Sequence, residues 1–153
     1  MLLFEVMNMI WWPVRGLKRS LTEKTLYSSK EKVRSMKIFK RSMHIYTIDV
    51  GNSNLLNFEI RALESAQYNT HKFGIYFSDS PRHADLLIVL GKPTEKMVDP
   101  LMNTIDQMPE PFGILIVEED DEVDLNLPNV VGRLKNPEPS DILSALLKIM
   151  ERN

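Results

Sequence analysis

"ADLLIVLG", residues 84–91, is the stretch that decides the predicted fold. The run is almost continuously apolar, as expected of a central strand that is covered on both faces. "FGILIVEE" at residues 112–119 predicts a second buried strand of the same kind. Three shorter apolar segments, bounded by polar residues and glycines, predict further strands at residues 44–49, 73–78 and 129–134.

Three segments with helical spacing alternate with these strands. In residues 54–67 the spaced apolar positions are Leu55, Phe58, Ala62 and Leu63, and the expected N-cap is Asn54. In residues 93–108 they are Met97, Leu101, Ile105 and Met108, with Thr94 as the expected N-cap and Pro100 as a bend or the true start. Residues 140–150 predict a last helix, capped by Ser140. This alternation indicates one α/β domain with a mainly parallel sheet, over residues 41–153.

The composition limits the chemistry of the chain. Its 153 residues make about one domain, and its apolar and charged fractions, 43% and 26%, are those of a globular protein. The sequence contains no cysteine. Disulfides, zinc–thiolate sites and cysteine-ligated iron–sulfur clusters are therefore excluded within this chain.

A basic arm precedes an acidic body. Residues 1–43 hold ten Lys and Arg against three Asp and Glu, a net charge of +7, whereas residues 44–153 hold nine against eighteen, a net charge of −9. This asymmetry favours contact of the arm with an anionic surface, and the alternative is a solvated, disordered leader. The apolar run at residues 1–12 is too short to span a bilayer, and it lacks the layout of a signal peptide.

We expect residues 1–40 to form an amphipathic basic arm that lies on a membrane or on a membrane-embedded partner. The residues expected to anchor it are Trp11, Trp12, Arg15, Lys18 and Arg19. No nucleic-acid partner is predicted, because no recognisable nucleic-acid motif accompanies the basic and aromatic residues.

Sites in parallel α/β sheets form at the carboxyl ends of the strands. The loop at residues 49–54 has that position, as do "GKPT" at 91–94 and the acidic run at 118–124. The first loop has one glycine and no lysine, so its signal for phosphate binding is weak. The acidic run lacks the glycine and spacing of a calcium loop, so we expect a solvated loop there and no metal site.

The histidines do not indicate an enzyme. His44 opens a strand and His71 lies in a polar loop, so neither stands beside other catalytic residue types. Only His83 lies in a charged context, between Arg82 and Asp85, and one histidine with one arginine makes neither a metal site nor a nucleophile–base pair. These three residues either contact a partner or fix a loop before a buried strand.

"SPRHADLLIVLGKPTEKMVDPL", followed by "QMPEPFGILIV", resembles the cluster-bearing B-type polypeptide of NADH:quinone oxidoreductase. It is even more similar to the small subunit of membrane-bound, formate-hydrogenlyase-type nickel–iron hydrogenases. The resemblance covers about residues 41–150 and ends in "NPEPSDILSALL". It implies a flavodoxin-like three-layer fold. It also implies that relatives hold a 4Fe–4S cluster with four cysteines.

The positions that match the four ligands lie at Ser53, Leu56, Asp120 and Lys135. These side chains cannot jointly replace four thiolates, and leucine has no donor atom. The resemblance therefore implies a degenerate member of the family with no cofactor of its own. The 4Fe–4S clusters are expected in its relatives and in partner subunits. This chain is then not expected to be catalytic alone.

The resemblance makes Glu59, Arg82, His83 and Asp85 candidates for contacts with a partner. The implied partners are a large catalytic subunit, a ferredoxin-like subunit and membrane-arm subunits. We therefore expect a peripheral, structural subunit of an oxidoreductase complex at the cytoplasmic face of the cell membrane. It could act by holding the distance between cofactors in its neighbours. The alternative is a repurposed module that binds a nucleotide, an anion or a quinone in the cleft left by the cluster.

Overall fold

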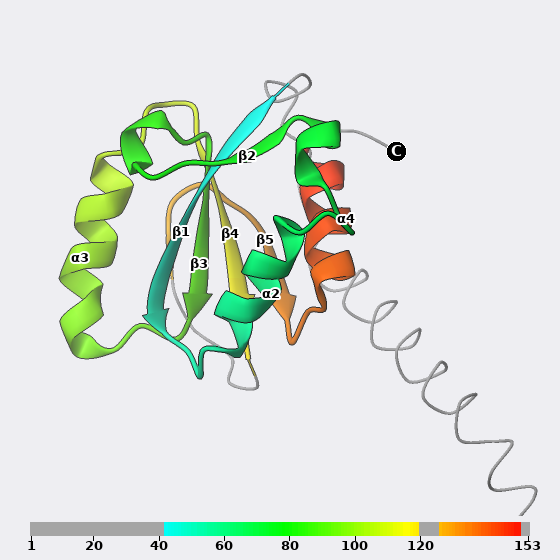
Figure 1. The fold of residues 1–153 in the computed structure, drawn as a ribbon. Helices are drawn as coiled ribbons and strands as arrows, with labels where there is room; N and C mark the ends of the chain where they lie inside the picture. The colour runs from blue at the N-terminus through cyan, green and yellow to red at the C-terminus, as the bar shows by residue number, and fades with distance from the viewer. Residues whose placement is uncertain (1–41, 120–125, 151–153) are drawn as a thin grey trace, which may run out of the picture. The chain divides into compact units, whose positions relative to one another are not determined.

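The structure, a computed structural model, describes residues 42–119 and 126–150 (Figure 1). The predicted arm at residues 1–40 lies outside these described residues, and its role as a separate domain stays a prediction. The predicted site residues that fall outside them are Trp11, Trp12, Arg15, Lys18, Arg19 and Asp120.

One parallel sheet forms the centre of the described domain. Its strands are β1 (Met43–Gly51), β2 (Ile75–Phe77), β3 (Leu86–Gly91), β4 (Gly113–Glu118) and β5 (Val130–Lys135), in the order β2-β1-β3-β4-β5. All four neighbouring pairs are parallel, so the prediction of a mainly parallel sheet is confirmed. The predicted strand at residues 73–78 is shorter than expected, because Phe73 ends a 3₁₀ turn and Gly74 has a left-handed φ of 77°.

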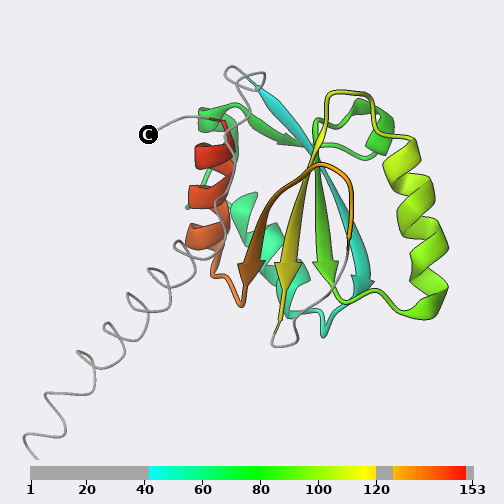
Figure 2. The same cartoon turned by 180° about the vertical axis from the view of Figure 1, so that it is seen from behind.

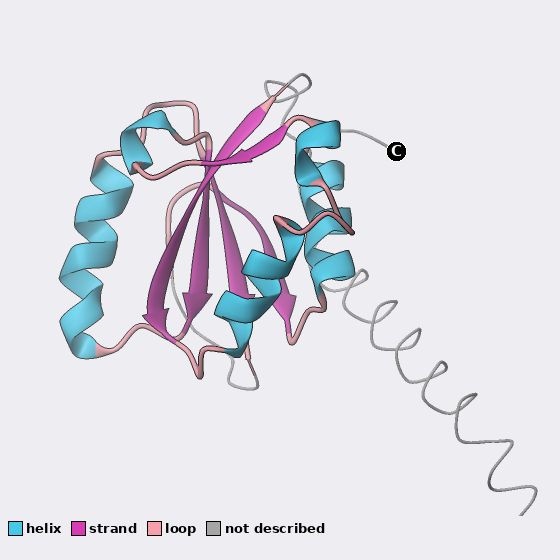
Figure 3. Cartoon of the chain, in the orientation of Figure 1, coloured by secondary structure: helices cyan, strands magenta, loops and turns pink. Residues whose placement is uncertain are grey.

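Helices cover both faces of this sheet. Helices α2 (Leu55–Leu63) and α4 (Pro139–Ile149) pack on one face and contact each other, and α3 (Glu95–Asp106) covers the other face (Figures 1 and 2). These are the three layers of a flavodoxin-like fold, as the sequence predicts. Loops leave the carboxyl ends of β1, β3 and β5 and enter α2, α3 and α4 at one edge of the sheet (Figure 3).

The core explains why the two apolar runs decide the fold. Every residue of β3 and of β4 is buried. Side chains alternate between the two faces of a strand, so a strand covered on both sides must be apolar throughout. Leu87 and Val89 of β3 share one cluster with Ile116 of β4 and with Leu101 and Ile105 of α3.

Helix α3 buries the side that the sequence predicts. Leu101, Ile105 and Met108 are buried and Met97 packs partly buried against them. Thr94 is the N-cap residue, although its side chain makes no capping hydrogen bond. Pro100 lies inside the helix and does not mark its start.

Helix α2 has the opposite outcome. Leu56, Ile60 and Leu63 are buried, whereas Leu55 and Phe58 are 51% and 67% exposed. The prediction that Leu55 and Phe58 face the core is therefore wrong. The helix carries two apolar stripes one residue out of phase, and spacing alone does not decide which of them meets the sheet.

The predicted cap of the last helix is also wrong. The N-cap of α4 is Glu138, whose backbone N–H donates to Oδ2 of Asp141 at 3.3 Å. Pro139 takes the first helical position because its fixed φ suits that site and it has no N–H to satisfy, which moves the cap back by one residue. Ser140 lies inside the first turn, where its carbonyl oxygen accepts from Oγ of Ser144 at 2.7 Å.

Candidate functional site

Two glycines bring the loops after β1 and β3 into close contact. Gly51 and Gly91 pair across the strands, and the carbonyl oxygen of Gly51 accepts from the N–H of Lys92 at 3.1 Å. Gly91 has a φ of +81°, and a Cβ atom there would clash with the carbonyl of Gly51. Only glycine fits this close approach without strain. The entries to α2 and α3 are therefore held together at the carboxyl edge of the sheet.

The loop between β1 and α2 is closed by its own side chains. Asp49 accepts from the N–H of Gly51 at 3.0 Å and, through its other oxygen, from Nδ2 of Asn57 at 2.8 Å. Oδ1 of Asn52 accepts from the N–H of Asn54 at 2.6 Å. Asn54 takes the N-cap position of α2, as predicted, with a left-handed φ of 69° and no side-chain capping bond. These bonds fix the direction in which α2 leaves the strand.

Ser53 joins this loop to the end of β4. Its N–H and its Oγ both donate to Oε1 of Glu119, at 2.9 and 2.6 Å, although the two residues are 66 positions apart. The bond places a carboxylate near the N-terminus of α2, where negative charge is favourable. Sequence reasoning missed this contact, because it treated Glu119 as part of a solvated acidic run.

Glu118 corrects the same prediction. It is the last residue of β4 and is only 4% exposed, so the first position of the acidic run is buried and not solvated. Its Oε1 accepts from Nη1 of Arg133 on β5 at 3.3 Å. The signal that could have found it is the alternation of β4, which places Glu118 on the same face as Ile116. Residues 120–124 of the run lie outside the described residues.

The positions that match the cluster ligands do not come together as a donor set. Ser53 is exposed and occupied by Glu119, and Lys135 is exposed at the end of β5, opposite Glu118 in the sheet. Leu56 is buried, 1% exposed, on the face of α2 that carries Ile60 and Leu63. The residues at these three positions offer no thiolate, so they do not fit an iron–sulfur cluster.

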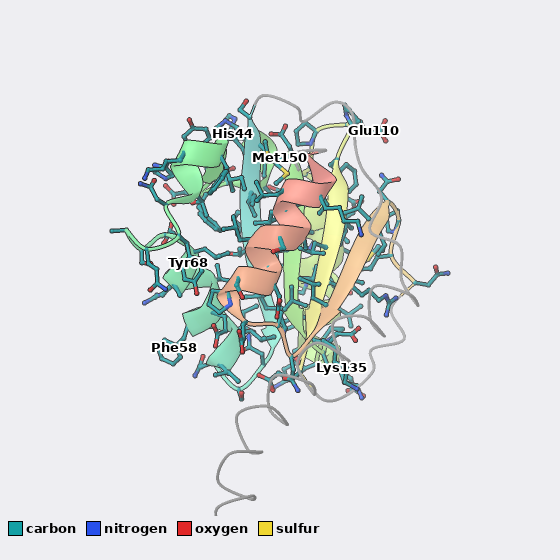
Figure 4. The ribbon with its side chains drawn as sticks, turned by 90° about the vertical axis from the view of Figure 1, so that its right-hand side faces the viewer. His44, Phe58, Tyr68, Glu110, Lys135 and Met150 are labelled. Atoms are coloured by element: carbon teal, nitrogen blue, oxygen red, sulfur yellow. The ribbon has the colours of Figure 1, made fainter. Side chains whose placement is uncertain are left out.

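The predicted contact residues lie in two places. Glu59 is half-buried on α2, near the loop cluster. Arg82 and His83 are exposed in the 3₁₀ turn Pro81–His83, before the amino end of β3. Six residues of strand, about 20 Å, separate the two ends of β3. Figure 4 shows the two edges of the sheet, with His44 at one and Lys135 at the other.

Asp85 has the structural role that was the alternative in the sequence. Its Oδ2 accepts from the N–H of His44 at 2.8 Å, and its own N–H donates to the carbonyl oxygen of His44 at 2.7 Å. Its carbonyl oxygen accepts from the N–H of Gly113 at 3.0 Å. Asp85 therefore fixes the amino ends of β1, β3 and β4. A contact role for Glu59, Arg82 and His83 stays a prediction.

Two further features of the described residues bear on chemistry. In residues 42–119 and 126–150, no three His, Asp or Glu side chains gather where they could hold a metal ion. None of the helices in these stretches combines the length and the hydropathy that crossing a bilayer requires.

Known proteins resemble parts of this chain. No protein-family model matches it. It is 37% identical over 76 residues to formate hydrogenlyase subunit 7 of Escherichia coli K12, which covers 50% of this chain and 30% of that protein. It is 32% identical over 81 residues to the probable membrane-bound hydrogenase subunit mbhJ of Pyrococcus furiosus, covering 53% of this chain and 48% of that one.

A third relative is the B-type polypeptide of the NADH-quinone oxidoreductase of Chlorobium limicola, 40% identical over 57 residues, which are 37% of this chain and 30% of that protein. A solved chain of the membrane-bound sulfane sulfur reductase, an archaeal respiratory membrane complex, has the same fold. Its TM-score is 0.60 at 22% identity, over 74% of this chain and 71% of that one.

The chain thus spans about a third to a half of the length of these curated relatives. The relatives are, by name, subunits of hydrogenases and of a quinone oxidoreductase. The resemblance that the sequence indicated is confirmed. This chain is a cysteine-free homologue of the hydrogenase and NADH-quinone oxidoreductase subunits named above.

Proposed function

We propose that this chain is a cluster-free structural subunit of a membrane-bound complex of the hydrogenase or NADH:quinone oxidoreductase type. The observation that carries the proposal is an intact fold with non-ligating residues where relatives are expected to bind iron. Ser53 is bonded to Glu119 and Leu56 belongs to the core. Without thiolates the chain holds no cofactor and relays no electrons, so it acts by shape and contact.

The packing of the domain supports a role without a cofactor. All residues of β3 and β4 are buried, and the loop that would cradle a cluster is held by hydrogen bonds among its own groups and to Glu119. A network whose groups are satisfied within the chain rigidifies a site without a bound ligand. The domain therefore presents a fixed surface on which other subunits can assemble.

In this proposal the body docks on a large catalytic subunit, and the arm at residues 1–40 meets the membrane arm at the cytoplasmic face. The basic and apolar residues of the arm support this placement, since interfacial segments combine Trp with Lys and Arg. The names of the homologues support the class of complex.

The test is purification of the tagged, full-length protein from native membranes in mild detergent. We expect stoichiometric co-elution of a large hydrogenase-type or quinone-oxidoreductase-type subunit. The isolated recombinant chain, analysed in parallel, should contain neither iron nor acid-labile sulfide. Recovery of the chain from the soluble fraction with no such subunit would overturn the proposal, and so would stoichiometric iron in the recombinant chain.

One observation favours the alternative of a small-ligand module. Nδ2 of Asn52, in the loop after β1, is buried and has no hydrogen-bond acceptor among the described residues. A ligand with an acceptor atom would satisfy this group. Against it, the nearby Ser53 donors are already taken by Glu119. A ligand that binds the native state raises the melting temperature, so thermal shifts with nucleotides and quinone analogues test the idea, and a flat response counts against it.

A further inference from the structure

Helix α2 carries a second apolar stripe on its outer side. Phe58 follows Leu55 by three positions, and the half-buried Ala62 follows Phe58 by four. Residues at these spacings lie one above another on a helix. The stripe that packs in the core is made of Leu56, Ile60 and Leu63. We call Leu55 and Phe58 the outer patch, and in Figure 4 the ring of Phe58 points away from the body.

The outer patch is more exposed than any other apolar pair in the described part of the chain. Leu55 and Phe58 are the two most exposed large apolar side chains there, while the pair on α3, Val98 and Met102, is 42% and 43% exposed. A helix that is apolar on two sides is usually covered on both. Adjacent exposed apolar side chains with polar neighbours are typical of protein–protein contact sites.

The backbone beneath the outer patch is held in place before any partner arrives. Asn57, between the two residues, donates to Asp49, and Ser53, two residues before Leu55, donates to Glu119. A surface that is already ordered loses less conformational entropy when it binds. Polar groups thus border the apolar pair, as in the anatomy of interfaces, where an apolar centre has a polar rim.

The charges near the patch favour one kind of occupant. Asp49 and Glu119 bond to its neighbours, Glu59 follows Phe58, and Arg61 is the cation one turn away. Residues 44–153 as a whole have a net charge of −9. An anionic lipid surface is repelled by such a body. A protein surface with an apolar pocket and a basic rim is complementary to it.

We propose that the outer patch is the surface on which a partner subunit docks, with Phe58 in an apolar pocket of the partner that is bordered by Lys or Arg side chains. This inference rests on the proposed function and names the surface that it requires. Buried aromatic side chains at the centre of an interface carry much of its affinity. The loss of Phe58 should therefore separate the chain from its partner while leaving the fold intact.

The test compares two double variants of the tagged, full-length protein, purified from native membranes. Leu55→Ser/Phe58→Ser removes the outer patch, and Val98→Ser/Met102→Ser removes the exposed pair of α3 as a matched control. We expect the first variant to retain less than a tenth of the partner that the wild type recovers, and the control to retain all of it. Circular dichroism verifies folding, and the single change Phe58→Ala serves if the double variant unfolds.

Each other outcome contradicts the proposal in a distinguishable way. A wild type that recovers no partner defeats the proposed function itself. Equal recovery by the wild type and the patch variant leaves the proposed function standing and overturns the docking surface. Binding of the wild type, but not of the patch variant, to vesicles of phosphatidylglycerol and phosphatidylcholine would assign the patch to lipid. Dimerisation of the purified wild type that the variant abolishes would assign it to a second copy.

Discussion

Helices α2 and α3 begin in the same way and end with opposite outcomes. Each follows a strand that ends in a glycine, Gly51 or Gly91, and each carries apolar residues at helical spacing. In α3 the stripe selected from the sequence is buried, and in α2 the selected stripe is the exposed one.

The difference lies in the number of apolar residues and in the loops. Six of the nine residues of α2 are apolar, so two stripes compete for the sheet. In α3 the first turn holds Glu95 and Lys96, and the strongest apolar positions fall on one side. The phase of α2 is set by the left-handed Asn54 and by the bond from Asn57 to Asp49. Loop geometry therefore decides what apolar spacing leaves open.

The largest expected effects come from the buried stripe of each helix. Leu56→Ala and Leu101→Ala should each lower the free energy of unfolding by about 2–5 kcal/mol, because each removes a fully buried side chain and leaves a cavity. Urea denaturation of the purified protein measures both. The control is Leu55→Ala, which should change stability by about 0.5 kcal/mol or less. A greater loss from Leu55→Ala than from Leu56→Ala would reverse the assignment of the two stripes.

The junction of the two helices comes next. Gly91→Ala should destabilise the protein by about 1–3 kcal/mol, because it forces a side chain into a left-handed conformation and against the carbonyl of Gly51. Thr94→Ala is the control at the same loop, since the Thr94 side chain makes no capping bond. Equal melting curves for the two variants would show that the loop relaxes and does not fix the helix entries.

A smaller effect is expected at the bond that pins α2 to β4. Ser53→Ala removes the Oγ–Glu119 bond and keeps the backbone bond, so the free energy of unfolding should fall by about 1 kcal/mol. Hydrogen exchange of the first amides of α2 should become faster. Glu119→Gln retains an acceptor oxygen and should cost less than Glu119→Ala. Unchanged exchange in Ser53→Ala would mean that the loop's own bonds suffice.

The smallest effects on stability belong to the exposed pairs. Phe58→Ser and Met102→Ser should each change the free energy of unfolding by only about 0.5 kcal/mol, because neither side chain is covered in the described domain. Thermal melts of the two variants measure this directly. A large loss for Phe58→Ser alone would show that its ring is packed within the chain and is not free for a partner.

Most of the fold follows from the sequence because buried strands leave a local signal. The apolar runs of β3 and β4 and their alternation with helices predicted a parallel sheet and the edge at which loops gather. The order of the strands was not predicted, since it depends on which strands meet in space. The cap at Glu138 was missed because Pro139 was not weighed as the first helical residue.

The site was predictable in place and not in detail. Ser53 was identified as a position in the loop, but its partner Glu119 lies 66 residues away, and no local pattern couples them. The pair of Glu118 and Arg133 depends on the register between β4 and β5, which is fixed only when the sheet forms. Long-range polar pairs of this kind require the structure.

The parallel order of the sheet also has a kinetic consequence. Within the described sheet no two neighbouring strands are joined by a hairpin, and β1 must find β3 across α2 and β2 before the centre of the sheet exists. Folding rates fall as contacts become more distant in sequence, so this domain should assemble in milliseconds to seconds and not in microseconds. During that interval the runs that make β3 and β4 are open to association with other chains, and early capture by an assembly partner would protect them.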